Sequence, residues 1–343
     1  MIVICLEWSF FGLADISSKG EIYQLRINKI EFTKKVPSDR VKHVIDQEKI
    51  ECSKTSIETM FDGIQEKKPH TLEELYKEYR YAGKTAVNIF ECTDFPEGLK
   101  VKEGFLVHLK RKLNITSALI GNELKPEITT VPQINLIEDL GEAVLLQWVS
   151  GEKKIGYDGY EVVERIVPSF EYMMIRFGDP IFIELRSGFS THKKYKEALK
   201  SLLSTSADNI PNIDWLPVTK VTEAEAEKIS EILEAGLLES EVIGEGCIGK
   251  LAVSAAPGID DLKKQEQYKS MVAGREYLAQ VFHVDYQEVD TGYSTKVKFR
   301  INHKGGFEFK SKVSERIIRR ILDVFVEVRY RKESEQGNNE AVS

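Results

Sequence analysis

Long apolar runs are missing from this sequence of 343 residues. The two longest, at residues 1–6 and 8–14, each end at an acidic residue, whereas a helix that crosses a bilayer needs about 20 apolar residues. The N-terminus also lacks the basic segment and the small-residue cleavage site of a secretory signal. The sequence therefore predicts a cytoplasmic protein that makes no membrane contact.

Cysteine and histidine are scarce, and neither occurs in a metal-binding pattern. The cysteines lie far apart, none in a CxxC pair, and are predicted to be reduced structural thiols. They are Cys5, Cys52, Cys92 and Cys247. The six histidines have no paired spacing, and the motifs GxxxxGK[ST], GxSxG and HExxH are missing as well. We therefore expect no cofactor, and no catalytic residue is predicted.

Composition is that of an ordinary globular protein, with 42% hydrophobic and 30% charged residues. A chain of this length suits two or three packed domains. Predicted strands come in runs joined by short turns, so we expect an α+β fold in which helices cover antiparallel sheets. The predicted divisions are a mixed α/β N-terminal region at 1–98, compatible with a winged-helix-like module, a strand-rich central domain at 99–204, a C-terminal α+β domain at 205–332 and a disordered tail at 333–343.

Hydrophobic periodicity assigns the individual elements. Residues 21–32 and 99–113 alternate in polarity and are predicted as strands. Residues 71–80 have a helical apolar face and begin with the capping-box spacing of Thr71 and Glu74. Residues 222–239 are predicted as one acidic helix. In the centre, separate strands are predicted at 143–149, 161–166, 170–177 and 180–186, with turns at the glycines between them.

The C-terminal part has the clearest pattern. Residues 295–302 are predicted to form a strand with three apolar residues on one face and Lys296, Lys298 and Arg300 on the other. A turn leads to a returning strand at 307–310, and a helix is predicted from Ser314. The same order of strand, turn, strand and helix occurs at 170–203, which is compatible with two domains of a similar plan.

Positive charge is concentrated in this segment, although the whole chain has a net charge of −7. Residues 295–332 contain twelve cationic and four acidic residues, which gives 12 − 4 = +8. Alternate residues of a strand lie about 6.6–6.8 Å apart on one face, so a row of cations can follow the phosphates of a nucleic acid and displace their counterions. The predicted nucleic-acid-binding residues are Lys296, Lys298, Arg300, Lys304, Lys310, Lys312, Arg316, Arg319 and Arg320.

These residues predict a non-catalytic nucleic-acid-binding subunit of a larger intracellular assembly, with phosphate contacts to the nucleic acid and a further protein partner. The sequence has neither the RNP-like aromatic pair nor the glycine-rich clamp of common RNA-binding modules, and DNA is favoured over RNA. Smaller basic clusters at 100–112 and 193–200 would line the same groove if the fold brings them together.

Two alternatives remain open. The basic face could dock an acidic protein partner or the acidic helix of a second copy, which would make the chain a protein-interaction or scaffold subunit. A metal-dependent nuclease around Glu184 is the enzymatic alternative, because Asp179 or Asp158 could join Glu184 in holding a divalent ion. Arg186 stands where such sites usually have a lysine, and arginine cannot act as a base.

Overall fold

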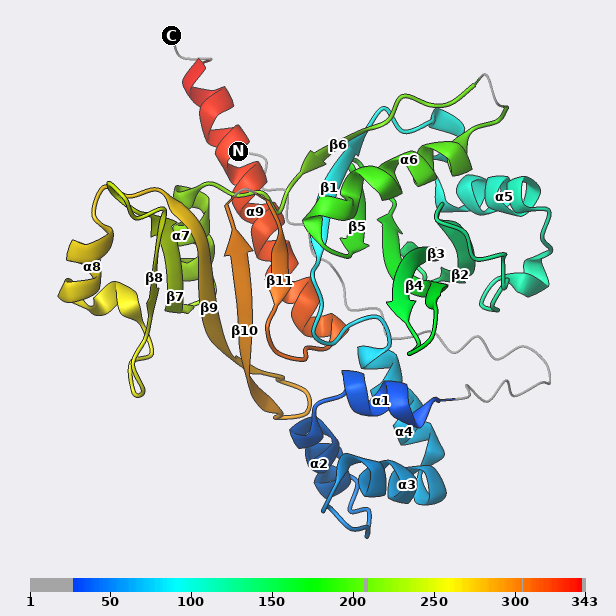
Figure 1. The fold of residues 1–343 in the computed structure, drawn as a ribbon, viewed down its shortest axis with the longest axis horizontal. Helices are drawn as coiled ribbons and strands as arrows, with labels where there is room; N and C mark the ends of the chain where they lie inside the picture. Colours follow the sequence, from blue (N-terminus) through cyan, green and yellow to red (C-terminus); the bar gives the residue numbers. More distant parts are fainter. Residues whose placement is uncertain (1–26, 207–208, 304, 341–343) are drawn as a thin grey trace.

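The computed structural model describes residues 27–206, 209–303 and 305–340. Two antiparallel sheets lie beside each other, and α9 (Glu315–Glu340) runs between them (Figure 1). This arrangement confirms the predicted α+β fold with antiparallel sheets covered by helices. Within the described ranges, every helix is too short or too polar to span a bilayer. The apolar run at residues 1–6 lies outside the described residues.

The first sheet has the strand order β2-β3-β4-β5-β1-β6. Its strands are β1 (Asn88–Thr93), β2 (Gln133–Asp139), β3 (Ala143–Tyr157), β4 (Val162–Arg176), β5 (Ile181–Arg186) and β6 (Asp214–Pro217). One face packs against α5 (Lys102–Leu113) and α6 (His192–Leu203). There, Trp148 of β3 shares an apolar cluster with Phe105 of α5 and Leu199 of α6, and all three are buried.

The second sheet has the order β11-β10-β9-β7-β8. Its strands are β7 (Gly236–Ile243), β8 (Lys250–Ser254), β9 (Tyr277–Gln287), β10 (Ser294–Asn302) and β11 (Phe307–Phe309). Two helices accompany it besides α9, namely α7 (Glu223–Ile232) and α8 (Glu266–Val272). Val297, Phe299 and Ile301 alternate along β10 as predicted and are buried in one cluster with Ile321 and Phe325 of α9. The periodicity of this C-terminal unit was therefore readable from the sequence.

The N-terminal helices form a unit with its own apolar core below the two sheets in Figure 1. They are α1 (Lys29–Lys35), α2 (Ser38–Gln47), α3 (Ile57–Lys67) and α4 (Pro69–Tyr79). Phe32 of α1 packs edge-on against Phe61 of α3, with ring centroids 5.1 Å apart, and Tyr76 of α4 completes the contact. These side chains come from three helices, so the core of the unit depends on all of them.

A short segment after these helices joins the two sheets. Val87 N–H donates to the Phe307 carbonyl at 2.9 Å and Phe309 N–H to the Thr85 carbonyl at 2.8 Å, so residues 85–87 cover the edge of β11 before the chain enters β1. The buried Asn88 amide then donates to the Ser187 carbonyl at 2.8 Å. The first sheet takes β1 and β6 from either side of the boundaries predicted at 98/99 and 204/205. The division into domains remains a prediction.

The strand predicted at 99–113 is wrong, because the segment forms a 3₁₀ turn followed by α5. Phe105, Val107 and Leu109 suggested alternation, yet only Phe105 and Leu109 are buried, whereas Val107 is 62% exposed. A spacing of four residues places two side chains on one face of a helix. The buried pair therefore follows the helical period and not that of a strand.

Two more boundaries differ from the sequence prediction. The predicted strand at 21–32 ends inside α1, whose first turn is capped by the Asn28 side chain, and residues 21–26 lie outside the described ranges. The helix predicted at 222–239 stops at Ile232, because Glu234 adopts a positive φ of 51° and the Ala235 N–H bonds back to the Ser230 carbonyl. Such a left-handed residue ends many helices. The chain then enters β7.

The start of α4 and the end of α9 also differ from the sequence prediction. Helix α4 begins at Pro69, so Thr71 lies inside the first turn and does not cap it. Proline suits the first helical position because its missing N–H would have no partner there. Helix α9 continues to Glu340, inside the segment predicted as a disordered tail.

Candidate functional site

The predicted cationic residues divide between the two sides of the second sheet. On β10, the apolar residues face α9, so Lys296, Lys298 and Arg300 lie on the opposite face. Arg316, Arg319 and Arg320 are exposed on α9, which covers the other face. The strand row and the helix row therefore cannot follow the same stretch of a phosphate backbone. Lys304 lies outside the described residues.

Carboxylates accompany most of the strand row. The Nζ of Lys296 lies 3.8 Å from carboxylate oxygens of both Asp260 and Asp285, and Arg300 is 3.1 Å from Glu241. Lys310 on the same face forms an ion pair with Glu308. Asp260 and Glu241 come from distant parts of the sequence, and together with Asp285 and Glu308 they offset much of the charge of a row that looks strongly basic by itself. A matched surface of this kind attracts fewer phosphates than the local charge excess suggests.

Lys312 has a structural role. Its ammonium group donates to the carbonyls of Thr33 at 2.9 Å and Val36 at 3.2 Å, at the C-terminal end of α1. Burial lowers the pKa of Lys312. Unpaired carbonyls and the negative end of the helix dipole both favour a cation at this position. The contact ties the C-terminal unit to the N-terminal helices and leaves little of this charge for a ligand.

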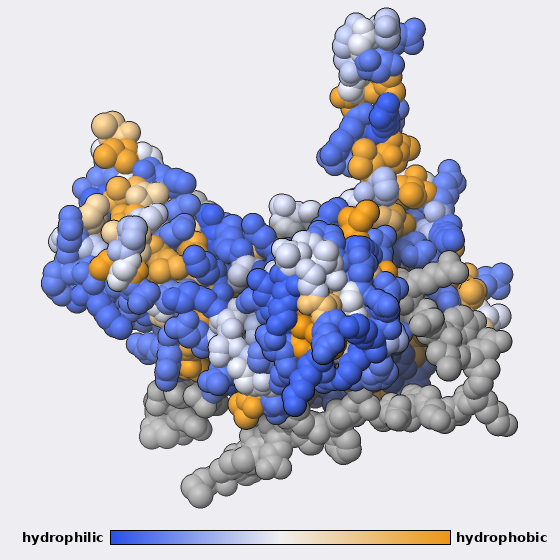
Figure 2. Space-filling model, turned by 90° about the horizontal axis from the view of Figure 1, so that it is seen from below, coloured by the Kyte–Doolittle hydropathy of each residue, from blue (hydrophilic) through white to orange (hydrophobic). Residues whose placement is uncertain are grey.

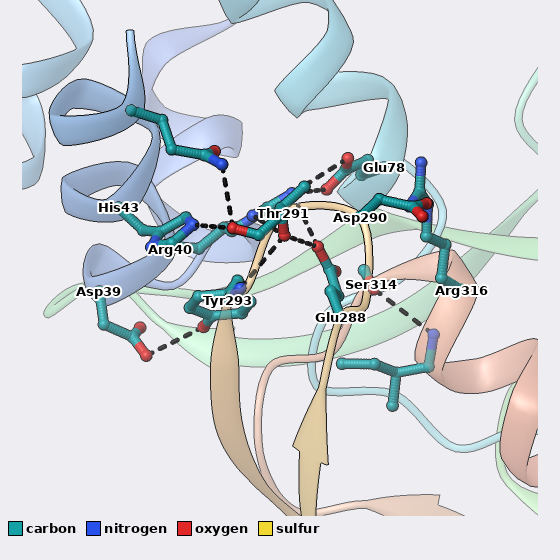
Figure 3. Close-up of polar contacts among 12 residues, drawn as sticks. Asp39, Arg40, His43, Glu78, Glu288, Asp290, Thr291, Tyr293, Ser314 and Arg316 are labelled. Carbon is teal, nitrogen blue, oxygen red and sulfur yellow. Dashed lines mark hydrogen bonds and ion pairs between the residues drawn. The ribbon is translucent and has the colours of Figure 1, made fainter. Parts of the chain in front are cut away.

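Arg316 also contacts another element. Its guanidinium lies 3.3 Å from the Asp290 carboxylate in the turn between β9 and β10 (Figure 3). The N-terminal helices hold the same turn. Arg40 is 3% exposed and lies 3.2 Å from both Glu78 and Glu288. Arg40 Nε and Glu288 Oε1 are buried with no hydrogen-bond partner among the described residues, and burial raises the pKa of Glu78 despite the charge of Arg40.

Further hydrogen bonds close the helices around this turn (Figure 3). The Thr291 carbonyl lies 3.0 Å from His43 Nε2 and accepts a hydrogen bond of 2.9 Å from the Gln47 amide. The Tyr293 hydroxyl donates to Asp39 at 2.9 Å. The turn is thus enclosed by polar contacts on several sides, which is typical of a structural contact and not of an open binding site.

Only Arg319 and Arg320 of the predicted residues on α9 remain exposed without an ion pair to another residue in the described part of the chain. Asp323 follows them by one helical turn. Burial raises the pKa of Asp323, and the positive charges of Arg176, Arg319 and Arg320 oppose that rise. Three guanidinium groups therefore lie near Asp323, and because Arg176 is also paired with Glu184, the excess of positive charge in this small patch comes from Arg319 and Arg320.

The two smaller basic clusters lie on α5 and α6, which cover the first sheet. Lys102 is 3.0 Å from Asp139, and Lys196 forms an ion pair with Asp214. Lys112 donates to the Ser204 carbonyl at 3.0 Å. These cations are occupied locally and belong to a different layer from β10, so the three basic segments do not line one groove.

Glu184 lies in a buried ion-pair network. Its Oε1 accepts from Arg186 Nε at 2.7 Å and its Oε2 from Arg176 Nη2 at 2.8 Å. Arg186 is also 2.8 Å from Glu315 at the start of α9. Burial by itself would raise the pKa of Glu184, but the charges of Arg186 and Arg176 lower it to about 2. Both carboxylate oxygens are therefore already engaged by cations.

The acids proposed as metal ligands are not assembled around Glu184. Glu184 of β5 lies opposite Met174, near the C-terminal end of β4. Asp158 follows the end of β3 and lies beside the opposite end of β4, where that strand begins at Val162. The twelve-residue separation from Val162 to Met174 alone spans roughly 40 Å in an extended strand. In the described ranges, no group of three histidine, cysteine or acidic residues is placed to hold a metal ion. The geometry at Glu184 thus supports a structural role.

Sequence reasoning missed an arm formed by the outer halves of β3 and β4. The register between these strands runs without interruption from Ala143 opposite Arg176 to Tyr157 opposite Val162. The pairing with β2 stops at Val149 and that with β5 begins at Tyr172. Residues 150–171 therefore have no strand partner outside the pair, and after Gly151, whose N–H still donates to the Thr129 carbonyl at 2.6 Å, the two strands form a ribbon beyond the sheet. Figure 2 shows it as a narrow projection, at the place of β3 and β4 in Figure 1, along which apolar and polar residues alternate.

One face of this β3–β4 arm is apolar and exposed. Directly opposite residues share a face, and the register pairs Tyr157 with Val162, Ile155 with Glu164 and Lys153 with Ile166. The four apolar side chains of this face are 51–75% exposed: Ile155, Tyr157, Val162 and Ile166. The Lys153 ammonium and the Glu164 carboxylate form an ion pair at 2.8 Å beside them. We call these six residues the apolar arm face.

The tip and the base of the arm are well defined. At the tip, Asp158 accepts hydrogen bonds of 2.9 Å from the N–H groups of Tyr160 and Glu161. At the base, Lys194 donates to Ser150 at 2.9 Å, and burial raises the pKa of Glu171 to about 7. The sequence signal was present, because polar and apolar residues alternate on both sides of an Asp-Gly turn. Reading the glycines at 151 and 156 as turns hid it.

No protein-family model matches the chain, and no curated protein is significantly similar to it in sequence.

We predict that Glu184→Gln lowers the free energy of unfolding by about 3 kcal/mol, because Arg186 and Arg176 lose their buried counter-charge. The folded-state pKa of Glu184, about 2, lies below its ordinary value of 4.5. The ionised group therefore contributes stability that is present above about pH 4.5 and is lost as the pH falls toward 2. Urea unfolding of both proteins at several pH values should show a shallower acid dependence for the variant. The exposed Glu197→Gln should behave as wild type, and an equal effect at both positions would contradict this role.

We also predict that Arg40→Ala costs about 3 kcal/mol of stability, because it leaves the buried Glu288 without its counter-charge and removes the nearest cation from the part-buried Glu78. Lys42→Ala, on an exposed position of the same helix, should cost less than about 0.5 kcal/mol. Hydrogen exchange would locate the effect, with faster exchange in the turn at residues 288–293. Unchanged protection of this turn in Arg40→Ala would contradict the assignment.

Proposed function

We propose that this protein is a protein-interaction subunit of a larger assembly and that the β3–β4 arm is its docking element. The observation that carries the proposal is the exposure of four large apolar side chains on one face of a ribbon whose outer part has no further strand partner in the described ranges. An isolated two-stranded hairpin is only marginally stable in water. Contiguous exposed apolar surface with a polar border is typical of a protein interface. A partner that covers this face would stabilise the ribbon and remove its apolar side chains from water.

The charge of the arm favours a protein over a nucleic acid. Between residues 152 and 165 it contains three cationic and four acidic residues, which gives 3 − 4 = −1. The cations are Lys153, Lys154 and Arg165, and the acids are Glu152, Asp158, Glu161 and Glu164. Binding to DNA or RNA depends on an excess of positive charge near the phosphates. The arm has none, and its affinity would come from apolar burial.

Site-specific photo-crosslinking in the cells that express the chain would test this function. A benzophenone amino acid replaces Tyr157 or Val162 on the apolar arm face, or Lys154 on the opposite face. We expect a discrete adduct from the first two positions and at least a several-fold weaker one from Lys154. Ile155→Asp should reduce the adduct from Tyr157, because burying an isoleucine contributes about 1.5–3 kcal/mol. If neither apolar position gives an adduct, the arm is not a docking element.

Nucleic-acid binding remains a second candidate function, and DNA is favoured over RNA. The observation that favours it is the pair of exposed arginines Arg319 and Arg320 beside Asp323, since Arg176, which is also near Asp323, is already paired with Glu184. The patch lies on the opposite side of the second sheet from the strand row. It would supply phosphate contacts without base recognition.

Mobility-shift titrations at several salt concentrations would test this candidate. Arg319→Gln/Arg320→Gln should weaken DNA binding and reduce the slope of log K against log salt by about 2, since each lost phosphate contact removes about 0.9. Lys296→Gln/Lys310→Gln should change the slope by less, because both lysines already have acidic neighbours. If wild-type protein does not bind at about 50 mM salt, or both double variants lose equally, the patch is not a nucleic-acid site.

A further inference from the structure

We infer that the partner of the β3–β4 arm is a second copy of this chain, bound through the apolar arm face around a twofold axis. The inference rests on the proposed function of the arm and names its partner. It is carried by the arrangement of opposite charges beside the apolar centre of this face. Lys153 and Glu164 lie on that face next to Ile166 and Ile155, their opposite neighbours in the register.

A twofold contact brings the same surface of both copies together. If residue i of one copy contacts residue j of the other, then residue j of the first copy also contacts residue i of the second. A face that contains one lysine and one glutamate is complementary to itself under this operation. The lysine of each copy can approach the glutamate of the other while the apolar side chains pack between them. A partner of one charge sign would leave either Lys153 or Glu164 opposite a like charge.

The size of the face fits a dimer. The exposed parts of Ile155, Tyr157, Val162 and Ile166 amount to on the order of 500 Å² per copy, since a large side chain presents roughly 150–250 Å². Two copies would bury on the order of 1,000 Å² of apolar side-chain surface, before backbone and polar atoms are counted. Stable specific interfaces begin at about 1,200 Å² in total.

The opposite face of the arm limits the assembly to two copies. There, Lys154 lies directly across from Arg165, and Glu152 lies across from Val167. Adjacent like charges make this face a poor surface for apolar packing. Pro168 interrupts the free edge of β4 with a residue that has no N–H to donate. Face-to-face packing on one side therefore closes the assembly and does not extend into a fibre.

Light scattering coupled to size exclusion tests the oligomeric state of the full chain. Over about 1–100 µM, a range that spans weak to moderate affinities, wild-type protein should reach twice the chain mass of 39.1 kDa. Ile155→Asp should raise the dissociation constant by roughly 30-fold or more. Arg165→Ala, on the opposite face, should leave it within about twofold. Circular dichroism confirms that each variant folds, and the arm lies outside the apolar cores.

A charge exchange gives a sharper test. Lys153→Glu alone and Glu164→Lys alone each place like charges across the twofold axis and should weaken the dimer by at least about tenfold. An equimolar mixture of the two variants should form a mixed dimer, because every contact between copies then joins opposite charges. Within each variant chain, residues 153 and 164 still have the same charge sign. Recovery of the dimer in the mixture can therefore come only from contacts between the two chains.

The outcomes separate this inference from the proposed function. A wild-type chain that stays monomeric throughout the concentration range, or a dimer that survives Ile155→Asp, overturns the second copy as partner. In that case, a crosslink from Tyr157 to a different protein leaves the docking function standing. A crosslink of twice the chain mass, together with recovery in the mixed variants, supports both. If the apolar arm face gives no crosslink at all, the docking function fails as well.

Discussion

The buried guanidinium of Arg186 connects three parts of the molecule that are far apart in the sequence. It donates to the Tyr81 carbonyl at 2.7 Å, to Glu184 in its own strand at 2.7 Å and to Glu315 at 2.8 and 3.0 Å. A buried charge is costly unless every donor is matched, so the segment that follows α4, the first sheet and the start of α9 must meet in one geometry. This contact positions the start of α9, and the apolar cluster that α9 shares with the second sheet positions the rest of the helix.

Once α9 is placed, the distribution of charge follows. The helix covers the apolar face of the second sheet, so the cations of β10 lie on the opposite face. Asp260, which follows β8, then meets Lys296, and Glu241 of β7 reaches Arg300 across the intervening strand β9. A local excess of +8 can thus exist in a chain of net charge −7 without making one basic surface. Short-range electrostatics depend on neighbours in space, and those neighbours are acidic here.

The outer part of the arm differs in that its apolar face is exposed and no helix of the described ranges covers it. Elsewhere, the sheets bury their apolar faces against helices, as Trp148 does against α5 and α6. Farther along the same strand, Ile155 is 75% exposed. One continuous strand therefore serves the core at one end and projects into solvent at the other. That contrast is the physical reason for proposing the arm, and not the more conspicuous basic segment, as the docking element.

The sequence by itself determined features that depend on local periodicity. The alternation along β10, the apolar stripe of α9 and the α+β class were readable because side chains repeat every 2 or 3.6 residues within one element. The tertiary structure alone decided which acids face the basic row and that Glu184 is held by two arginines. It also decided that β3 and β4 extend beyond their neighbouring strands. Each of these depends on residues that meet across long separations in the chain, as Arg186 and Glu315 do. A local pattern contains no information about such contacts, which is why the basic segment stood out in the sequence although its acidic neighbours did not. The alternation of the arm was present in the sequence, but only the tertiary structure showed that its strands continue through Gly151 and Gly156 and extend beyond the sheet.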